Sequence, residues 1–207
     1  MKLILLGQIA SGKGTLSQAL QDKYGFKAVS IGLLLREEAR KNTEEARLID
    51  ECLKKGNLVS DDLALRVLKK YLESAGDGNI IFDGYPRNIA QAESLKSIAR
   101  IDRVLFLNIE DNVVRERFLG RRECEDCGYV SNINYPEYNG FCPKCNGHLA
   151  KRNDLNEEAM ANKMKSFEKD TKPLVDYYKK EGLLVKIDAS QTQQTILKQA
   201  EEILQLK

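Results

Sequence analysis

A glycine-rich segment near the N-terminus has the residue types that bind phosphate. It runs from Gly7 to Thr15, directly after the short apolar run Lys2–Leu6 and ahead of a stretch with helical spacing. Small residues in this setting let backbone N–H groups converge on phosphate oxygens at the start of a helix. Lys13 adds a positive charge for the β and γ phosphates, and Thr15 offers a hydroxyl beside a magnesium ion. The predicted nucleotide-binding loop consists of Ala10, Ser11, Gly12, Lys13, Gly14 and Thr15.

A cysteine cluster forms a second candidate site. Four of the five cysteines make two C-x-x-C pairs, separated by 14 residues, in a chain whose N-terminus is too short for a secretion signal. Such pairs indicate metal binding, and four thiolates give zinc a closed tetrahedral site with no open position for catalysis. We therefore expect a structural zinc ion. His148, the only histidine, is an alternative to Cys145 as a ligand. The predicted ligands are Cys124, Cys127, Cys142 and Cys145.

Short apolar runs that alternate with helical patterns predict the elements that position these sites. The expected strands are residues 2–6, 27–29, 80–82, 104–107 and 183–187. The expected helices include one that Asp61 caps, one over 111–122, a long one that opens at Asp154 and is kinked by Pro173, and a last one over 192–206. This alternation predicts an α/β fold with a five-stranded parallel sheet flanked by helices.

Two segments interrupt the alternation and divide the chain. Residues 31–59 are rich in charged residues with scattered leucines, and predict small helices on a mobile insert. Residues 123–151 contain glycine, proline, asparagine and cysteine, and predict a separate small module. Residues 1–30, 60–122 and 152–207 then form the core.

The composition excludes some classes of function. The net charge is only +2 although 31% of the residues are charged, which gives no strong attraction to nucleic acid or an anionic membrane. No apolar run approaches the roughly 20 residues of a membrane-spanning helix. A cytoplasmic enzyme is the simplest interpretation.

Charged residues near the predicted strand ends suit phosphate chemistry. Asp83 follows an apolar strand on the same sheet edge as the phosphate loop, so it can hold magnesium through water. Arg117 and Arg121 are four residues apart and are expected to share one helix face. Taken alone, that pair favours a solvated basic face. Beside a phosphate loop it favours phosphate binding, because a guanidinium pairs with two phosphate oxygens at once.

The segment Phe82-Asp83-Gly84-Tyr85-Pro86-Arg87-Asn88 resembles the Asp-Gly-(Phe/Tyr)-Pro-Arg segment of adenylate kinases and their UMP/CMP kinase relatives. The Gly-Lys-Gly-Thr order of the phosphate loop resembles the same kinases, and the absence of an Asn-Lys-x-Asp motif argues against a GTPase. The resemblance covers essentially the whole chain. It continues through Gly32-x-x-x-Arg36, Leu58-Val59, Arg117-x-x-x-Arg121-Arg122, Arg152-x-Asp154 and Lys172-Pro173-Leu174.

The chain is thus similar to the adenylate kinases with a zinc-containing lid. The resemblance implies a P-loop NTPase fold, a monophosphate-binding insert at 31–59 and a lid at 123–151 that closes over ATP. It implies reversible transfer of a phosphoryl group, ATP + AMP to 2 ADP, by a monomer with Mg²⁺ as cofactor. The partners are nucleotides, with no nucleic acid and no membrane.

The resemblance also implies a role for individual residues. Asp83 and Thr15 would hold magnesium, partly through water. ATP would contact the phosphate loop together with Arg117, Arg121 and Gln191. The monophosphate would contact Ile31, Arg36, Asn57, Leu58, Val59, Gly84, Tyr85, Pro86, Arg87, Gln91, Arg152 and Lys163. The catalytic residues would be Lys13, Arg87, Arg121, Arg152 and Lys163.

The chain departs from the family pattern mainly where the acceptor base binds. Ile31 and Leu33 stand where adenylate kinases usually have threonine and aspartate, and loss of a hydrogen bond relaxes discrimination between substrates. Asn88 is commoner in the UMP/CMP relatives, Lys163 replaces an arginine, and Ala10 replaces a glycine. We expect AMP as the main acceptor, with relaxed base selectivity. The alternatives are a UMP/CMP or broad-specificity kinase and, from another class, a nucleotide-sensing or RNA-binding zinc protein.

Overall fold

The centre of the protein is a five-stranded parallel sheet in the order β2-β3-β1-β4-β8. The computed structural model describes residues 1–54, 59–76, 78–151 and 155–206. The predicted α/β fold with this sheet is confirmed, and each strand lies within one residue of its expected bounds. The strands are β1 (Lys2–Gly7), β2 (Lys27–Ser30), β3 (Ile80–Asp83), β4 (Arg103–Asn108) and β8 (Leu184–Asp188).

Both faces of the sheet are buried, which explains why the strands read as continuous apolar runs. In β1, Leu3 and Leu5 contribute to one hydrophobic cluster and Ile4 and Leu6 to the other. The first cluster is completed by α1 (Lys13–Tyr24), α6 (Asp111–Gly120) and α9 (Gln193–Leu204). The second is completed by α2 (Ile31–Ala39), α4 (Asp61–Ala75), α5 (Ile89–Ile98) and α8 (Pro173–Lys180).

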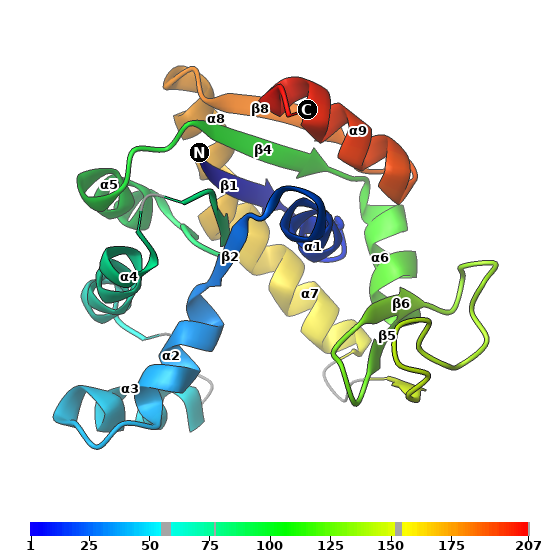
Figure 1. The fold of residues 1–207 in the computed structure, drawn as a ribbon, viewed down its shortest axis with the longest axis horizontal. Helices are drawn as coiled ribbons and strands as arrows, with labels where there is room; N and C mark the ends of the chain where they lie inside the picture. The colour runs from blue at the N-terminus through cyan, green and yellow to red at the C-terminus, as the bar shows by residue number, and fades with distance from the viewer. Residues whose placement is uncertain (55–58, 77, 152–154, 207) are drawn as a thin grey trace.

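Two arms leave the sheet on the same side, as Figure 1 shows. One arm consists of α2 and α3 (Glu44–Lys54), which follow β2. The other is a small antiparallel sheet in the order β6-β5-β7, formed by β5 (Arg121–Cys124), β6 (Val130–Asn132) and β7 (Leu149–Ala150). Helix α7 (Glu157–Ser166) runs between the arms in this view.

The helix after β4 ends earlier than the sequence predicts. It was expected to include Arg121 and Arg122, but α6 ends at Gly120, and Arg121 begins β5 with extended backbone. The reason is tertiary: Asn132 Nδ2 donates a hydrogen bond of 2.9 Å to the Arg117 carbonyl, the acceptor that the Arg121 N–H would use if the helix continued. The expectation that Arg117 and Arg121 share a helix face is therefore wrong.

Three smaller expectations about helices need correction. Ser60 is the N-cap of α4, and Asp61 lies in its first turn. The N-cap of helix α7 is Asn156, and the Asn156 side chain accepts a hydrogen bond from the Ala159 N–H. Asp154, the expected cap, lies outside the described residues. The expected kinked helix is instead α7, a π-helical turn (Phe167–Thr171) and α8, which begins at Pro173. Proline suits that first position because it has no N–H to satisfy.

None of the helices in the described parts of the chain has the length and apolar character needed to cross a membrane.

Candidate active site

The phosphate loop lies between β1 and α1, at the carboxyl edge of the sheet. Gly7 ends β1 at a point of close packing, where a Cβ would lie 2.6 Å from Ser11 Oγ and 2.7 Å from the Leu107 carbonyl. Gly12 has a φ of 92° and caps α1 without a side-chain hydrogen bond. The first N–H groups of α1 thus remain available for an anion. Ala10 is the non-glycine residue of this loop with a left-handed backbone, φ 57°.

Lys13 lies across the loop, held by backbone oxygens. Its Nζ donates hydrogen bonds to the carbonyls of Gly7 and Gln8, each at 2.7 Å. Burial lowers the pKa of Lys13 to about 8 from its usual value of 10.5. The Asp83 carboxylate opposes this shift, whereas the guanidinium groups of Arg87 and Arg121 add to it. Lys13 therefore shares one electrostatic environment with three other predicted site residues.

The segment after β3 supplies two of these groups. Asp83 ends β3 and pairs in register with Leu5 of β1, next to the phosphate loop. Gly84, with a φ of 73°, turns the chain, and its carbonyl accepts a hydrogen bond of 2.9 Å from Arg87 Nε. Tyr85 and Pro86 are buried, Tyr85 within the hydrophobic cluster below, whereas Arg87 is exposed at the sheet edge.

The start of α5 forms a polar network with the start of α4. The Gln91 Oε1 accepts a hydrogen bond from the Arg87 N–H, and its Nε2 donates one to Asp61 Oδ1, both at 2.7 Å. Asn88 caps α5 by accepting from the Gln91 N–H and donates to Asp61 Oδ2 at 3.4 Å. Sequence reasoning missed Asp61 as part of this site, because its partners lie about thirty residues away in the chain.

The predicted ATP-side residues belong to two groups. Arg117 of α6 donates to the Ala189 carbonyl at 2.7 Å and to the Ser190 carbonyl at 3.2 Å, so it anchors the loop after β8. Gln191 of that loop donates to Asp188 Oδ2 at 3.1 Å. Hydrogen bonds from Ser190 and Gln191 lower the pKa of Asp188 to about 2. Sequence reasoning also missed Asp188, although it ends an apolar strand just as Asp83 does.

Arg121 stands at the junction of the core and the small sheet. Its Nη2 lies 3.5 Å from Glu123 Oε2, and its buried Nε has no hydrogen-bond partner among the described residues. A buried guanidinium N–H without a partner is costly, so it indicates an anion-binding position. Lys163 of α7 lies over the Phe118 ring, with Nζ 5.3 Å from the ring centroid.

The residues on the α2 arm that were predicted to contact the monophosphate do not form one cluster. Arg36 is exposed on α2 and lies against Gly32. Ile31 is only 6% exposed and packs in the core, with the half-buried Val59 beside the same cluster. Leu33 is 55% exposed. Asn57, Leu58 and Arg152 lie outside the described residues.

The four clustered cysteines come together as a candidate metal site. Their Sγ atoms all lie within 4.8 Å of one another. The Sγ atoms of Cys124 and Cys145 are 3.4 Å apart, and those of Cys127 and Cys142 are 3.5 Å apart. Sulfurs in a tetrahedral site with Zn–S bonds of about 2.3 Å lie about 3.8 Å apart, so the donor set fits zinc. His148 lies instead with its Nδ1 3.4 Å from Glu125 Oε2.

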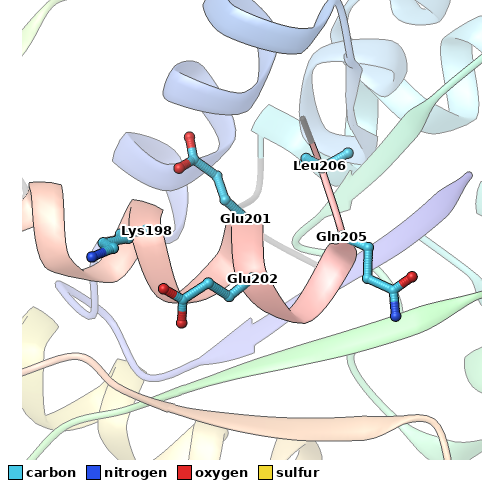
Figure 2. A pocket seen from close by; sticks show the side chains of 5 residues that line it. All are labelled: Lys198, Glu201, Glu202, Gln205 and Leu206. Atoms are coloured by element: carbon cyan, nitrogen blue, oxygen red, sulfur yellow. The ribbon is translucent and has the colours of Figure 1, made fainter.

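A shallow pocket on α9 is not a competing site. Figure 2 shows that its side chains point in different directions rather than toward one centre. Glu201 there accepts hydrogen bonds from Lys23 and Tyr24, at the end of α1 opposite the phosphate loop. The lining residues are Lys198, Glu201, Glu202, Gln205 and Leu206.

The similarity to known proteins extends over nearly the whole chain. A family model described as "Adenylate kinase" matches residues 5–183. The chain belongs to the adenylate kinase family. It is 35% identical to an adenylate kinase of Archaeoglobus fulgidus, over 99% of this chain and 98% of the relative. It is 37% identical to one of Methanothrix thermoacetophila, over 92% of both chains. An adenylate kinase of Hydrogenobaculum is 35% identical, over 99% of this chain and all of the relative.

Membership of this family confirms two expectations from the sequence. The chain is a phosphotransferase, and the family reaction is the transfer of a phosphoryl group from ATP to AMP to give two ADP. Adenylate kinases act on ATP with Mg²⁺, and Asp83 and Thr15 carry oxygen atoms of the kind that this ion prefers.

Proposed function

We propose that phosphoryl transfer in this chain occurs beside Lys13, between ATP on the phosphate loop and AMP at the start of α5. The observation that supports this most is the shared electrostatic environment of Lys13, Asp83, Arg87 and Arg121. Three cations around one carboxylate leave an excess of positive charge, which two nucleotides with several phosphates would neutralise. Phosphoryl transfer depends on such charge neutralisation and on in-line placement more than on acid–base chemistry.

We assign the cations by their existing hydrogen-bond partners and by the family resemblance. Lys13 would bind the β and γ phosphates. Arg87 would bind the monophosphate together with Arg36, and Arg121 would stabilise charge on the group in transfer through its unpaired Nε. Arg117 would act on ATP through the loop it anchors, because its guanidinium already binds two carbonyls there.

Further residues of the acceptor and ATP sites retain the roles that the family resemblance implies. Arg152 and Lys163 would contribute positive charge from the lid side. Gln191 would contact ATP. The acceptor would also contact Ile31, Asn57, Leu58, Val59, Gly84, Tyr85, Pro86 and Gln91.

Two metal ions would complete the enzyme. Magnesium, held by Thr15 and by Asp83 through water, would supply charge neutralisation between the phosphates. Zinc on the four cysteines would be structural, since four thiolates leave no open coordination position. Thiolate ligands must remain reduced, which agrees with a cytoplasmic location. We propose a monomer that needs no nucleic acid or membrane partner.

The base of the acceptor is where a related function competes. Asn88 and the apolar Ile31 favour the broader alternative, a kinase that also uses pyrimidine monophosphates, as in the UMP/CMP relatives. We favour AMP because Gln91 retains an amide that can read an aminopurine. An RNA-binding zinc protein is the weaker candidate, since the net charge of +2 gives no general attraction to nucleic acid.

The test is ADP formation from ATP and Mg²⁺ with AMP, CMP, UMP or GMP as acceptor. We expect turnover with AMP at the highest kcat/KM. Lys13→Met should lower kcat about 100- to 1000-fold, because it removes a charge that acts on the transferring group. Lys23→Met is the matched control, since Lys23 is on the same helix but binds Glu201. No turnover with any acceptor, or an equal loss in both variants, would contradict the proposal.

A further inference from the structure

The amide of Gln91 is held at both ends by groups that cannot exchange roles. Its oxygen faces the backbone N–H of Arg87, which can only donate. Its nitrogen faces a carboxylate oxygen of Asp61, which can only accept when ionised. Rotating the amide by 180° would place NH₂ against N–H and oxygen against carboxylate. Both hydrogen bonds would become repulsive contacts, so the structure permits one orientation.

The surroundings reinforce that orientation. Asn88 Nδ2 approaches the other Asp61 oxygen at 3.4 Å, and Asn88 Oδ1 accepts from the Gln91 N–H at 2.8 Å. Asp61 is thereby oriented by two amides and remains the acceptor for Gln91. These contacts use one lone pair of Gln91 Oε1 and one hydrogen of its Nε2. The half-buried Gln91 amide therefore keeps a second lone pair and a second hydrogen beyond these contacts.

A fixed amide distinguishes bases by chemistry rather than by size. Adenine presents a ring nitrogen that accepts and an amino group that donates, and cytosine presents the same pair on its smaller ring. Hypoxanthine, guanine and uracil present the reverse, a ring N–H and an oxo group. An amide with a fixed oxygen and a fixed NH₂ can pair with the first pattern and is mismatched with the second.

We propose that Asp61 and the Arg87 N–H fix the orientation of Gln91, so that the acceptor site selects amino bases over oxo bases whatever the ring size. Asp61 is a positioning residue in this scheme, acting through Gln91. The proposal rests on the proposed function, in which Gln91 faces the acceptor base. It separates selectivity for amino over oxo groups from selectivity for the size of the ring.

We expect ring size to be read weakly, because the α2 residues at the positions that the family resemblance assigns to the base are apolar. Ile31 and Leu33 carry no hydrogen-bonding group, and Ile31 is only 6% exposed. An apolar wall distinguishes ligands that differ in size by a modest factor, whereas an unpaired polar group in the site distinguishes them strongly. We therefore expect CMP to be accepted more readily than IMP, although IMP is nearly the same shape as AMP.

The first experiment compares matched acceptors with the unmodified enzyme. AMP and IMP differ at the reading edge, by an amino or an oxo group and the proton on N1, and CMP and UMP differ in the same way. We expect kcat/KM to favour the amino member of each pair by about 100-fold or more. Equal values for AMP and IMP would overturn this inference while leaving the kinase function intact. No turnover with any acceptor would instead contradict the proposed function.

The second experiment tests Asp61 itself. Asp61→Asn replaces an obligate acceptor by a group that can also donate, so the reversed Gln91 amide is penalised less. The AMP/IMP and CMP/UMP ratios should both fall about tenfold, the loss of one hydrogen bond to a charged group. The KM for ATP should not change. The matched control is Asp62→Asn, because Asp62 is the next residue on α4 and pairs with Arg66. Equal loss of activity on AMP and IMP would show a purely structural role and overturn the proposal.

Discussion

The sheet core and the small cysteine-bearing sheet are held together by different means. The core buries two hydrophobic clusters on opposite faces of five strands, with Leu3, Ile4 and Leu105 fully buried. The small sheet buries Cys124, Cys142 and Leu149 in a cluster of its own. Two of those three side chains are proposed metal ligands. Where a segment is too short to build a core, ligand bonds to a metal can replace hydrophobic burial.

The largest expected effect is therefore loss of a ligand. Cys142→Ser should abolish zinc binding, because it removes one of the four thiolate ligands. A structural site contributes its binding free energy, on the order of 10 kcal/mol, directly to folding. The small sheet should unfold, and turnover should fall about 100-fold through lost positioning of Arg121 at its base. Zinc content, measured by atomic absorption, and ADP formation check this.

The control for that substitution is Cys52→Ser. Cys52 is a half-buried thiol on α3, outside the cluster, so its replacement should leave zinc content and turnover unchanged. A Cys142→Ser protein that retains one zinc per chain would contradict the assignment. Normal turnover without zinc would show that the small sheet does not depend on the metal.

A core substitution should have a smaller effect, of a different kind. Leu105 is fully buried on β4, between β1 and β8. Leu105→Ala should lower the free energy of unfolding by about 2–5 kcal/mol, through lost transfer energy and a cavity. Zinc content should not change. Leu33→Ala, at a 55% exposed position, is the control and should change stability little. Chemical denaturation measures both, and equal effects would mean that the core is not where stability resides.

The smallest expected effect concerns the charge of Lys13 at the phosphate loop. Phosphate binding favours charged Lys13, whose pKa in the free protein is about 8. In the free protein Lys13 is mostly charged below that pH and mostly neutral above it, so ATP binding at higher pH is accompanied by uptake of a proton from the buffer. Between pH 7 and pH 9 the Kd for ATP should rise about tenfold, by linkage. Calorimetry in two buffers would measure the proton uptake.

The control for this pH dependence is Lys13→Arg, whose guanidinium stays charged and should remove the slope. An unchanged Kd for ATP from pH 7 to pH 9 in the unmodified protein would contradict the shifted pKa.

Sequence patterns predict those features here that depend on local chemistry. The five strands could be predicted because both faces are buried and each run ends at a polar residue or a glycine. The meeting of Lys13 and Asp83 could also be predicted, since carboxyl ends of parallel strands share one sheet edge. The four cysteines could be grouped by spacing alone.

Features that depend on distant contacts could not be predicted in this way. Charged residues after Phe118 fit a helix by propensity, but Asn132 takes the Arg117 carbonyl that the next helical turn would use, so α6 ends at Gly120 and Arg121 begins a strand. The same holds for Gln91, whose partner Asp61 is 30 residues away. Local patterns contain no information about which side chain arrives from elsewhere.

The strand order has a consequence for how the chain is made. Strand β1 lies at the centre of the sheet, yet Lys2 pairs with Ile80 and Leu3 with Arg103. Strand β1 leaves the ribosome before β3 and β4 and must wait for these partners, which are 78 and 100 residues later. At a synthesis rate of about 5–20 residues per second, that is roughly 4–20 s with an apolar strand exposed. The nascent chain should need chaperone protection during that interval, and the sheet edge that carries the phosphate loop and Asp83 forms only after β3 has joined β1.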